Sequence, residues 1–234
     1  DELIDCSNVP EDPIFQLTFP QRGMLEEEHY LELRALVAGG DKARLDSAIS
    51  RMRYELNPHP AGQMTHNRAV LDGRVLDGIQ HKYRETTLFF PSHGQTCHAY
   101  CTFCFRWAQF VGIEDLKFAS KEIEDLCAYL RRQPQITDVL ITGGDPMVMK
   151  AAVLERYIKP LLAIESVRTI RIGTKSVAYW PQRYVTDPDS DDVLALFEQV
   201  VLSGRQLAIM GHYSHPVELS TEMHSYAGAT PRVT

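Results

Sequence analysis

Asp138-Val139-Leu140-Ile141-Thr142-Gly143-Gly144-Asp145-Pro146 carries the clearest structural signal of this 234-residue chain. Its apolar half predicts a buried strand, and the two glycines with the following proline predict a turn where the strand ends. Similar strand-like runs occur at residues 87–91, 169–173 and 206–212. Helix-like stretches lie between them, at residues 121–133, 151–164 and 189–203. Pro160 should kink or end the second of these helices. Alternation of this kind predicts right-handed βαβ crossovers and a parallel sheet.

The N-terminal region has a different pattern. Residues 25–37 and 45–56 place apolar side chains at three- and four-residue intervals, which predicts two amphipathic helices, with Asp41 as N-cap of the second. Residues 57–62 form a turn-rich linker. We therefore expect a helical region with its linker over residues 1–80, a partial α/β barrel over residues 81–219 and an irregular tail over residues 220–234.

Composition narrows the class of protein. The apolar fraction of 44% and the charged fraction of 24% match soluble globular proteins. A net charge of −7 argues against a nucleic-acid-binding surface, because such surfaces concentrate Lys and Arg. No apolar run approaches the length of a membrane-spanning helix, and the acidic start Asp1-Glu2-Leu3-Ile4-Asp5 shows no secretory signal. We therefore expect a cytoplasmic protein with neither a membrane nor a nucleic acid as partner.

Three thiols lie within eight residues, in Cys97-His98-Ala99-Tyr100-Cys101-Thr102-Phe103-Cys104. A structural zinc site takes four protein ligands. A cubane iron–sulfur cluster held by three thiolates instead leaves one iron open to a small molecule. The other two cysteines lie elsewhere, and Cys127 falls on the apolar stripe of a predicted helix, where we expect a buried, inert thiol.

Chemically useful residues follow each predicted strand of the parallel sheet. The cysteines follow the first strand, the Gly143–Pro146 turn follows the second, Thr174-Lys175 follows the third and His212 ends the fourth. In parallel sheets, ligands gather at the C-terminal ends of the strands. The two glycines would let a ligand approach the backbone, and the Asp145 carboxylate could accept hydrogen bonds from a ligand ammonium group. The alternative for this motif is a plain strand-to-helix turn.

The C-x3-C-x2-C spacing, with Phe103 just before the third cysteine, resembles the signature of the radical S-adenosylmethionine (SAM) superfamily. The order of several segments narrows the resemblance to the lysine 2,3-aminomutase family. These segments are residues 97–106, 139–146, 170–183 and 212–216, with a weaker match at 81–83. The resemblance implies a TIM-like barrel of parallel strands, present here in part.

The resemblance also implies cofactors and an activity. Cys97, Cys101 and Cys104 would hold a [4Fe–4S] cluster whose open iron binds SAM. Reductive cleavage of SAM would give a 5′-deoxyadenosyl radical that starts the migration of an amino group on an amino acid, with pyridoxal phosphate (PLP) as a further cofactor. The implied SAM-binding residues are Phe103, Gly143, Gly144, Asp145, Thr174 and His212.

Further residues have implied roles near the substrate. Arg106 would grip the substrate carboxylate, a task that suits a two-pronged guanidinium. Lys82, Tyr83 and Arg183 match family positions near PLP or the substrate. The implied partners are a small amino-acid substrate, an electron donor of flavodoxin or ferredoxin type, and a second copy of the chain in a homo-oligomer.

The sequence departs from the family pattern in two places. Where the family has His-Arg-Tyr, this chain reads His81-Lys82-Tyr83, which displaces or replaces the basic group that would meet the PLP phosphate. Family members also continue through two more strands and a region that supplies the PLP lysine, whereas this sequence ends at Thr234. We therefore expect a truncated aminomutase-like chain.

Three alternatives remain open. The first is a radical SAM enzyme of the same fold that acts on another substrate without PLP. The second is a structural zinc site formed by the three cysteines with His93 or His98. The third is an inactive remnant that only binds a partner.

Overall fold

The computed structural model describes residues 4–56, 65–110, 115 and 117–219. The chain forms two compact units. The helical unit comprises Asp1–Gln63 and Tyr100–Lys117, and the sheet unit comprises Met64–Ala99 and Phe118–Thr234. The division falls inside the cysteine loop, so that Cys97 belongs to the sheet unit while Cys101 and Cys104 belong to the helical unit. The expected linker at 57–62 and the expected tail at 220–234 lie outside the described residues.

The helical unit contains the two helices predicted from the N-terminal sequence. The Asp41 carboxylate accepts a hydrogen bond from the Arg44 N–H at 3.0 Å and so caps the second of them, as predicted. The first ends at Gly39 and is capped by Gly40, whose φ of 70° allows the chain to turn back. The helices of this unit are α1 (Pro13–Thr18), α2 (Glu27–Gly39) and α3 (Lys42–Glu55).

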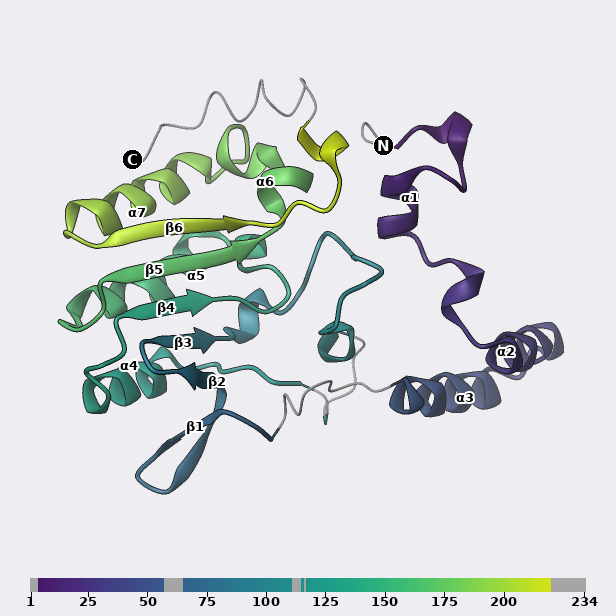
Figure 1. The fold of residues 1–234 in the computed structure, drawn as a ribbon, viewed down its shortest axis with the longest axis horizontal. Helices are drawn as coiled ribbons and strands as arrows, with labels where there is room; N and C mark the ends of the chain where they lie inside the picture. Colours follow the sequence, from purple (N-terminus) through teal and green to yellow (C-terminus); the bar gives the residue numbers. More distant parts are fainter. Residues whose placement is uncertain (1–3, 57–64, 111–114, 116, 220–234) are drawn as a thin grey trace. The chain divides into compact units, whose positions relative to one another are not determined.

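The sheet unit is built on a six-stranded sheet with the order β1-β2-β3-β4-β5-β6 (Figure 1). The first three strands pair antiparallel, and β3 to β6 pair parallel. The four predicted strands are confirmed, whereas β1 and β2 were not predicted. The described sheet is open, with β1 and β6 at its two edges, so a mixed α/β fold is confirmed and a closed barrel is not. The strands are β1 (Arg68–Leu71), β2 (Arg74–Tyr83), β3 (Thr86–Phe89), β4 (Asp138–Ile141), β5 (Thr169–Thr174) and β6 (Gln206–Gly211).

A two-residue turn joins β1 to β2. Leu71 pairs with Arg74, and the residues between them, Asp72 and Gly73, have φ values of 49° and 81°. Positive φ at both central positions is the geometry of a type I′ turn, which matches the twist of a β-hairpin. The second strand of this hairpin, β2, includes residue 81, which was the expected start of the barrel region.

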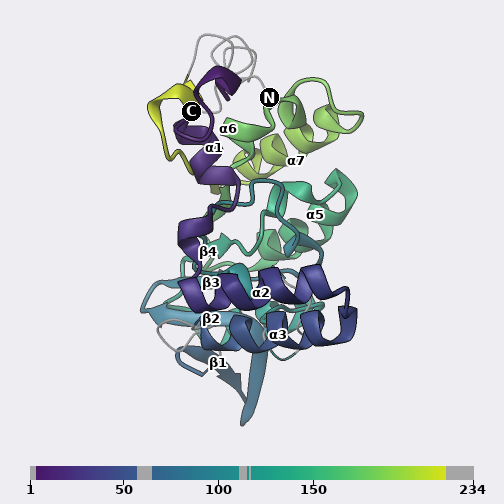
Figure 2. The same cartoon turned by 90° about the vertical axis from the view of Figure 1, so that its right-hand side faces the viewer.

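Helices of the sheet unit follow the predicted pattern. Figure 2 shows α5 and α7 on the same side of the sheet. The α5 helix ends at Ile158, and Pro160 lies in the 3₁₀ turn that follows, which confirms the predicted end. Cys127 is 4% exposed, and burial raises the pKa of its thiol, so the predicted buried cysteine is confirmed. These helices are α4 (Ile123–Arg132), α5 (Ala151–Ile158), α6 (Ser176–Tyr179) and α7 (Ser190–Leu202).

Alternate residues of the central strands form the core. Val139 and Ile141 of β4 pair in register with Ile170 and Ile172 of β5, and all four side chains are fully buried. They pack in one cluster with apolar residues of α4, α5 and α7. Burial of apolar area stabilises this packing by about 25 cal/mol per Å². The parallel register also brings the C-terminal ends of β3 to β6 together along one side of the sheet. We call this side, where the strands end, the carboxyl edge; it is distinct from the edge strands β1 and β6.

None of the helices in the described ranges combines the length and the apolar character that crossing a bilayer requires.

Candidate functional site

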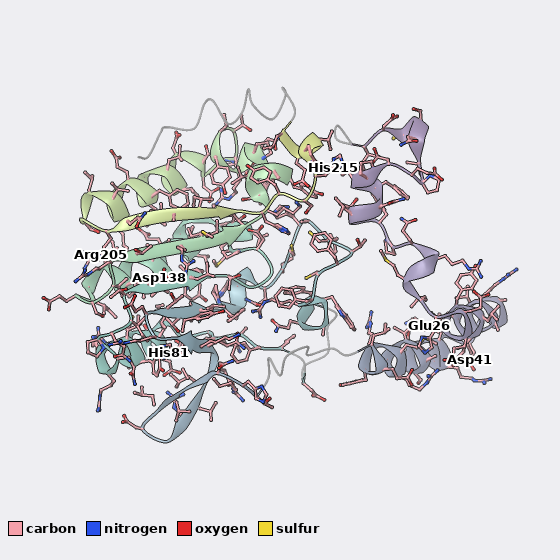
Figure 3. All side chains as sticks on the ribbon, viewed as in Figure 1. Glu26, Asp41, His81, Asp138, Arg205 and His215 are labelled. Atoms are coloured by element: carbon pink, nitrogen blue, oxygen red, sulfur yellow. The ribbon has the colours of Figure 1, made fainter. Side chains whose placement is uncertain are left out.

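The carboxyl edge brings together residues that the sequence placed after separate strands. Thr174 is the last residue of β5, and its hydroxyl donates to Asp145, which follows β4, at 2.7 Å. The His212 N–H, just beyond β6, donates to the Thr174 carbonyl at 2.9 Å. In Figure 3, His215 lies beyond this edge, whereas His81 and Asp138 lie at the opposite edge of the sheet. The carboxyl edge is therefore the candidate site.

Asp145 is the centre of this edge. Its side chain is 1% exposed and accepts hydrogen bonds from the Met147 N–H at 2.9 Å and the Lys175 N–H at 2.8 Å, in addition to the Thr174 hydroxyl. Its Oδ2 also lies 3.1 Å from Nε2 of His98. Burial alone would raise the pKa of Asp145, but the hydrogen bonds from His98, Thr174 and the Lys175 amide bring it below its ordinary value. The carboxylate predicted to meet a ligand ammonium is therefore saturated by protein donors.

A second layer of hydroxyl groups holds Thr174 in place. Thr174 Oγ1 lies 2.6 Å from the Ser176 hydroxyl, which lies 2.7 Å from the hydroxyl of Tyr184. Burial raises the pKa of Tyr184 to about 12, so this phenol stays protonated. The chain of hydroxyls therefore fixes the orientation of Thr174 toward Asp145.

The low pKa of Asp145 predicts a pH dependence of stability. Because the folded-state pKa lies below the ordinary value of 3.8, this group stabilises the fold fully above that pH, and the stabilisation is lost as pH falls from 3.8 through the folded-state pKa. The difference in unfolding free energy between wild type and Asp145→Asn should therefore be constant from about pH 7 to about pH 5 and shrink below about pH 4. Urea unfolding across this range measures it. A difference that grows on acidification would contradict the assignment.

The glycine turn packs directly on the base of the cysteine loop. The Asp145 N–H donates to the Thr96 carbonyl at 2.9 Å. A Cβ on Gly144 would lie 2.5 Å from the carbonyl oxygens of Gln95 and Thr96, and Gly143 has a φ of 144°. Gly144 is thus required by the close approach of two backbone segments, and Gly143 by its positive φ, which side chains disfavour. The turn joins the start of the cysteine loop to the end of β4.

Gly144→Ala should separate these two segments. The added methyl group would meet backbone atoms that cannot rotate away, so we expect a loss of about 2–4 kcal/mol in the free energy of unfolding. Urea unfolding measures the loss. Gly23→Ala is the matched control, because no atom lies within 4 Å of the added Cβ there, and it should change stability by less than about 0.5 kcal/mol. Equal effects of the two substitutions would contradict the packing described here.

His98 ties the loop that begins at Cys97 to this carboxylate. Its ring approaches Asp145 as described and meets the Trp180 ring edge-on at a centroid distance of 5.7 Å. From its sequence context, His98 is expected to act only as an alternative zinc ligand. Only its place in the cysteine loop could have indicated the contact, because its partner lies 47 residues further along the chain.

The three loop cysteines are divided between the two units. In the sheet unit, Cys97 is partly buried, and its Sγ accepts from the Ala99 N–H at 3.4 Å. In the helical unit, the Cys104 N–H donates to the Cys101 carbonyl at 3.0 Å, which forms a tight turn. Thr102 between them donates its N–H to the Leu17 carbonyl at 2.8 Å and so attaches this turn to α1. Burial raises the pKa of the Cys104 thiol, although Arg106 opposes the effect.

The donor set fits an iron–sulfur cluster in its chemistry. All three loop cysteines are thiols rather than disulfides, and each is partly accessible. Thiolates are the ligands that such clusters take. Within the described residues, no group of three or more His, Cys, Asp or Glu side chains is already arranged as a metal site. The cluster is therefore proposed from the donor set and its spacing, not from a preformed cage.

Arg106 and Phe103 lie in the helical unit beside the second and third cysteines. Phe103 is 51% exposed. Burial lowers the pKa of Arg106 to about 10, with the nearby Cys104 acting in the opposite direction, and its guanidinium lies 5.2 Å from the centre of the Phe105 ring. A partly desolvated guanidinium binds a carboxylate more strongly than a fully hydrated one. The role of Arg106 in holding the substrate carboxylate stays a prediction.

The residues predicted near PLP are not brought together. Tyr83 pairs with Thr86 at the start of β3, so Tyr83 and the neighbouring Lys82 lie at the edge opposite the carboxyl edge. Arg183 is 2% exposed and donates to the carbonyls of Met147 and Met149, each at 2.9 Å, and to Asp189 at 2.7 Å. Its guanidinium thus ties the turn after β4 to the start of α7. The described residues of the sheet unit gather no PLP site from this set.

Comparison with known proteins shows which proteins this chain resembles in sequence. No protein-family model matches it. A protein of Aquifex aeolicus whose name contains "L-lysine 2,3-aminomutase" is 38% identical over 148 residues, which cover 63% of this chain and 38% of that protein. This chain is a homologue of the lysine 2,3-aminomutases. The L-lysine 2,3-aminomutase of Acetoanaerobium sticklandii is 32% identical over 63% of this chain and 33% of its own length.

The homology extends to a second named activity. The glutamate 2,3-aminomutase of Clostridioides difficile is 31% identical over 126 residues, which cover 54% of this chain and 28% of that protein. The resemblance inferred from the cysteine loop and the strand ends is thereby confirmed. The chain spans roughly a third of the length of these aminomutases.

Proposed function

We propose that this chain holds a [4Fe–4S] cluster on Cys97, Cys101 and Cys104, binds SAM at the carboxyl edge and forms part of an aminomutase-like enzyme that acts on an amino acid. The observation that carries the proposal is the C-x3-C-x2-C loop following β3 in a homologue of proteins named for lysine and glutamate 2,3-aminomutation. An aminomutase is an isomerase, so the proposal places the chain in that class.

The chemistry divides between cofactor and protein. When bound, the cluster and SAM supply a carbon-centred radical that can abstract hydrogen from an unactivated substrate carbon. The protein's part is to position and to enclose. Asp145, saturated by its protein donors, keeps the glycine turn rigid so that the Gly143 and Gly144 backbone can receive a ligand ammonium. Arg106 would hold the substrate carboxylate through paired N–H groups.

Two finer parts of the proposal rest on the homology alone. The parallel strands β3 to β6 would form part of the wall of a TIM-like barrel. PLP stays a prediction, because the residues expected to bind it do not converge in the described part of the chain. An enzyme of the same fold that works without PLP is therefore the second candidate. The structural zinc site gains no support, since His98 approaches Asp145 and His93 lies 2.7 Å from the hydroxyl of Tyr157.

The experiment is SAM cleavage by the anaerobically reconstituted chain. Reduction with dithionite in the presence of SAM should release 5′-deoxyadenosine and methionine, and addition of lysine or glutamate should raise the yield if that amino acid is the substrate. Cys104→Ala prepared in the same way is the negative control. A yield no greater than that of the control would overturn the proposal.

A further inference from the structure

A buried lysine stands at the carboxyl edge without an assigned role. Lys175 follows β5 and is 4% exposed. Its ammonium group donates to the His212 carbonyl at 3.2 Å, to the Ser214 hydroxyl at 3.2 Å and to the Glu218 carboxylate at 2.6 Å. All three of its donors are therefore used, and all three acceptors lie in one short segment after β6.

Glu218 completes the arrangement from the other side. It is 0% exposed, although it lies in a short 3₁₀ turn (Pro216–Leu219) rather than in the core. One carboxylate oxygen meets Lys175, and the other accepts from the N–H groups of Ser214 and His215 at 2.9 and 3.0 Å. Lys175, Glu218 and the backbone of residues 212–215 thus form a closed set of hydrogen bonds, which we call the clasp.

The clasp is joined to the centre of the candidate site. The backbone N–H of Lys175 donates to Asp145, and the N–H of His212 donates to the carbonyl of Thr174. The segment after β6 is therefore attached to the same edge that carries the glycine turn. In addition, burial and then the Lys175 cation lower the pKa of His212, which favours a neutral imidazole that can accept a hydrogen bond.

A buried ion pair such as Lys175–Glu218 contributes little net stability to the fold. Two buried charges lose their hydration, and an apolar pair of similar volume is often equally or more stable. What an apolar pair cannot do is to bind two backbone amides, a hydroxyl and a carbonyl at fixed positions. The directed hydrogen bonds are therefore the property that distinguishes the clasp.

We propose that Lys175 and Glu218 are positioning residues that hold the His212–His215 segment at the carboxyl edge in the conformation that receives SAM. This inference rests on the proposed function, because it assumes that SAM binds at this edge. It adds two residues that act through the backbone they hold rather than by touching the ligand.

The test uses two variants of the full chain with the cluster reconstituted. Glu218→Gln keeps a carbonyl oxygen but leaves the Lys175 cation without a counter-charge. The double variant Lys175→Met/Glu218→Leu fills the space with apolar atoms and removes both charges. The expected result is a SAM dissociation constant raised about tenfold or more in both variants, with unchanged iron content. Amide hydrogen exchange at Ser214 and His215 should be accelerated about tenfold or more in both.

The double variant separates positioning from stability. It should recover the unfolding midpoint lost in Glu218→Gln but not the SAM affinity or the exchange protection. Asp138→Asn is the control, because it breaks the ion pair with Arg171 at the opposite edge of the sheet. It should leave SAM affinity and exchange at residues 212–218 unchanged.

Two results would overturn the inference. One is a SAM dissociation constant and an exchange rate in Glu218→Gln within about twofold of wild type. The other is a SAM dissociation constant and an exchange rate that return to the wild-type values in the double variant, which would show that the clasp acts only through its packing. If the wild-type chain binds no SAM, the proposed function fails, and unaltered exchange in the variants then rejects the clasp separately.

Discussion

Replacing Cys101 with alanine should leave the reconstituted chain almost without iron. The loop offers three thiolates to a cubane, and with one removed a second iron would lack a protein ligand. We expect about four iron atoms per wild-type chain and well below one in the variant. Iron and acid-labile sulfide analysis after anaerobic reconstitution and desalting measures this directly.

Cys6→Ser is the matched control for that experiment. Cys6 is an exposed thiol of the same helical unit and lies far from the loop in sequence, so its loss should not change the iron content. The Cys127→Ala variant should likewise keep its iron, because Cys127 lies on α4 with its side chain buried in the core. Full iron loading of Cys101→Ala would show that the loop does not hold the cluster.

Asp145→Asn should cause the largest loss of stability among single substitutions at the carboxyl edge. An asparagine has one acceptor oxygen in place of two, and its amide would face groups that already donate, such as the Lys175 N–H. Several buried donors would be left unpaired, so we expect a loss of about 3–5 kcal/mol in the free energy of unfolding. Urea unfolding followed by circular dichroism measures it.

Asp138→Asn provides the comparison. Asp138 also accepts several hydrogen bonds, from Arg171 and Thr86, but its side chain is 18% exposed and solvent can replace a lost partner. A loss of about 1 kcal/mol is expected there. If Asp145→Asn were no more destabilising than Asp138→Asn, the carboxylate would not be the centre of the edge.

The sequence predicted the parallel part of the sheet well because its signals are local. The apolar runs of β3 to β6 and the punctuation of the helices between them follow from residues that are neighbours in sequence. The β1–β2 hairpin was missed, although Asp72-Gly73 is a strong turn signal. The β1 strand has only four residues, and β2 carries exposed polar residues such as Arg74, Asp77 and Lys82, so neither shows the sustained apolar alternation that identifies a strand.

The candidate site was predicted in position but not in its contacts. Gly143, Asp145, Thr174 and His212 meet at one edge because the parallel register aligns the strand ends. Apart from the Met147 N–H, the partners of Asp145 come from 29 to 47 residues away, and no local pattern shows that they would saturate it. Arg183 illustrates the same limit, because its backbone acceptors cannot be recognised before the fold is known.

Mössbauer spectroscopy of the ⁵⁷Fe-reconstituted chain, recorded without and with SAM, addresses the proposed function most directly. The proposal predicts a [4Fe–4S] cubane in which one iron site differs from the others and changes its isomer shift when SAM is added. Absence of a cubane, or a cubane whose spectrum is the same with and without SAM, would contradict it.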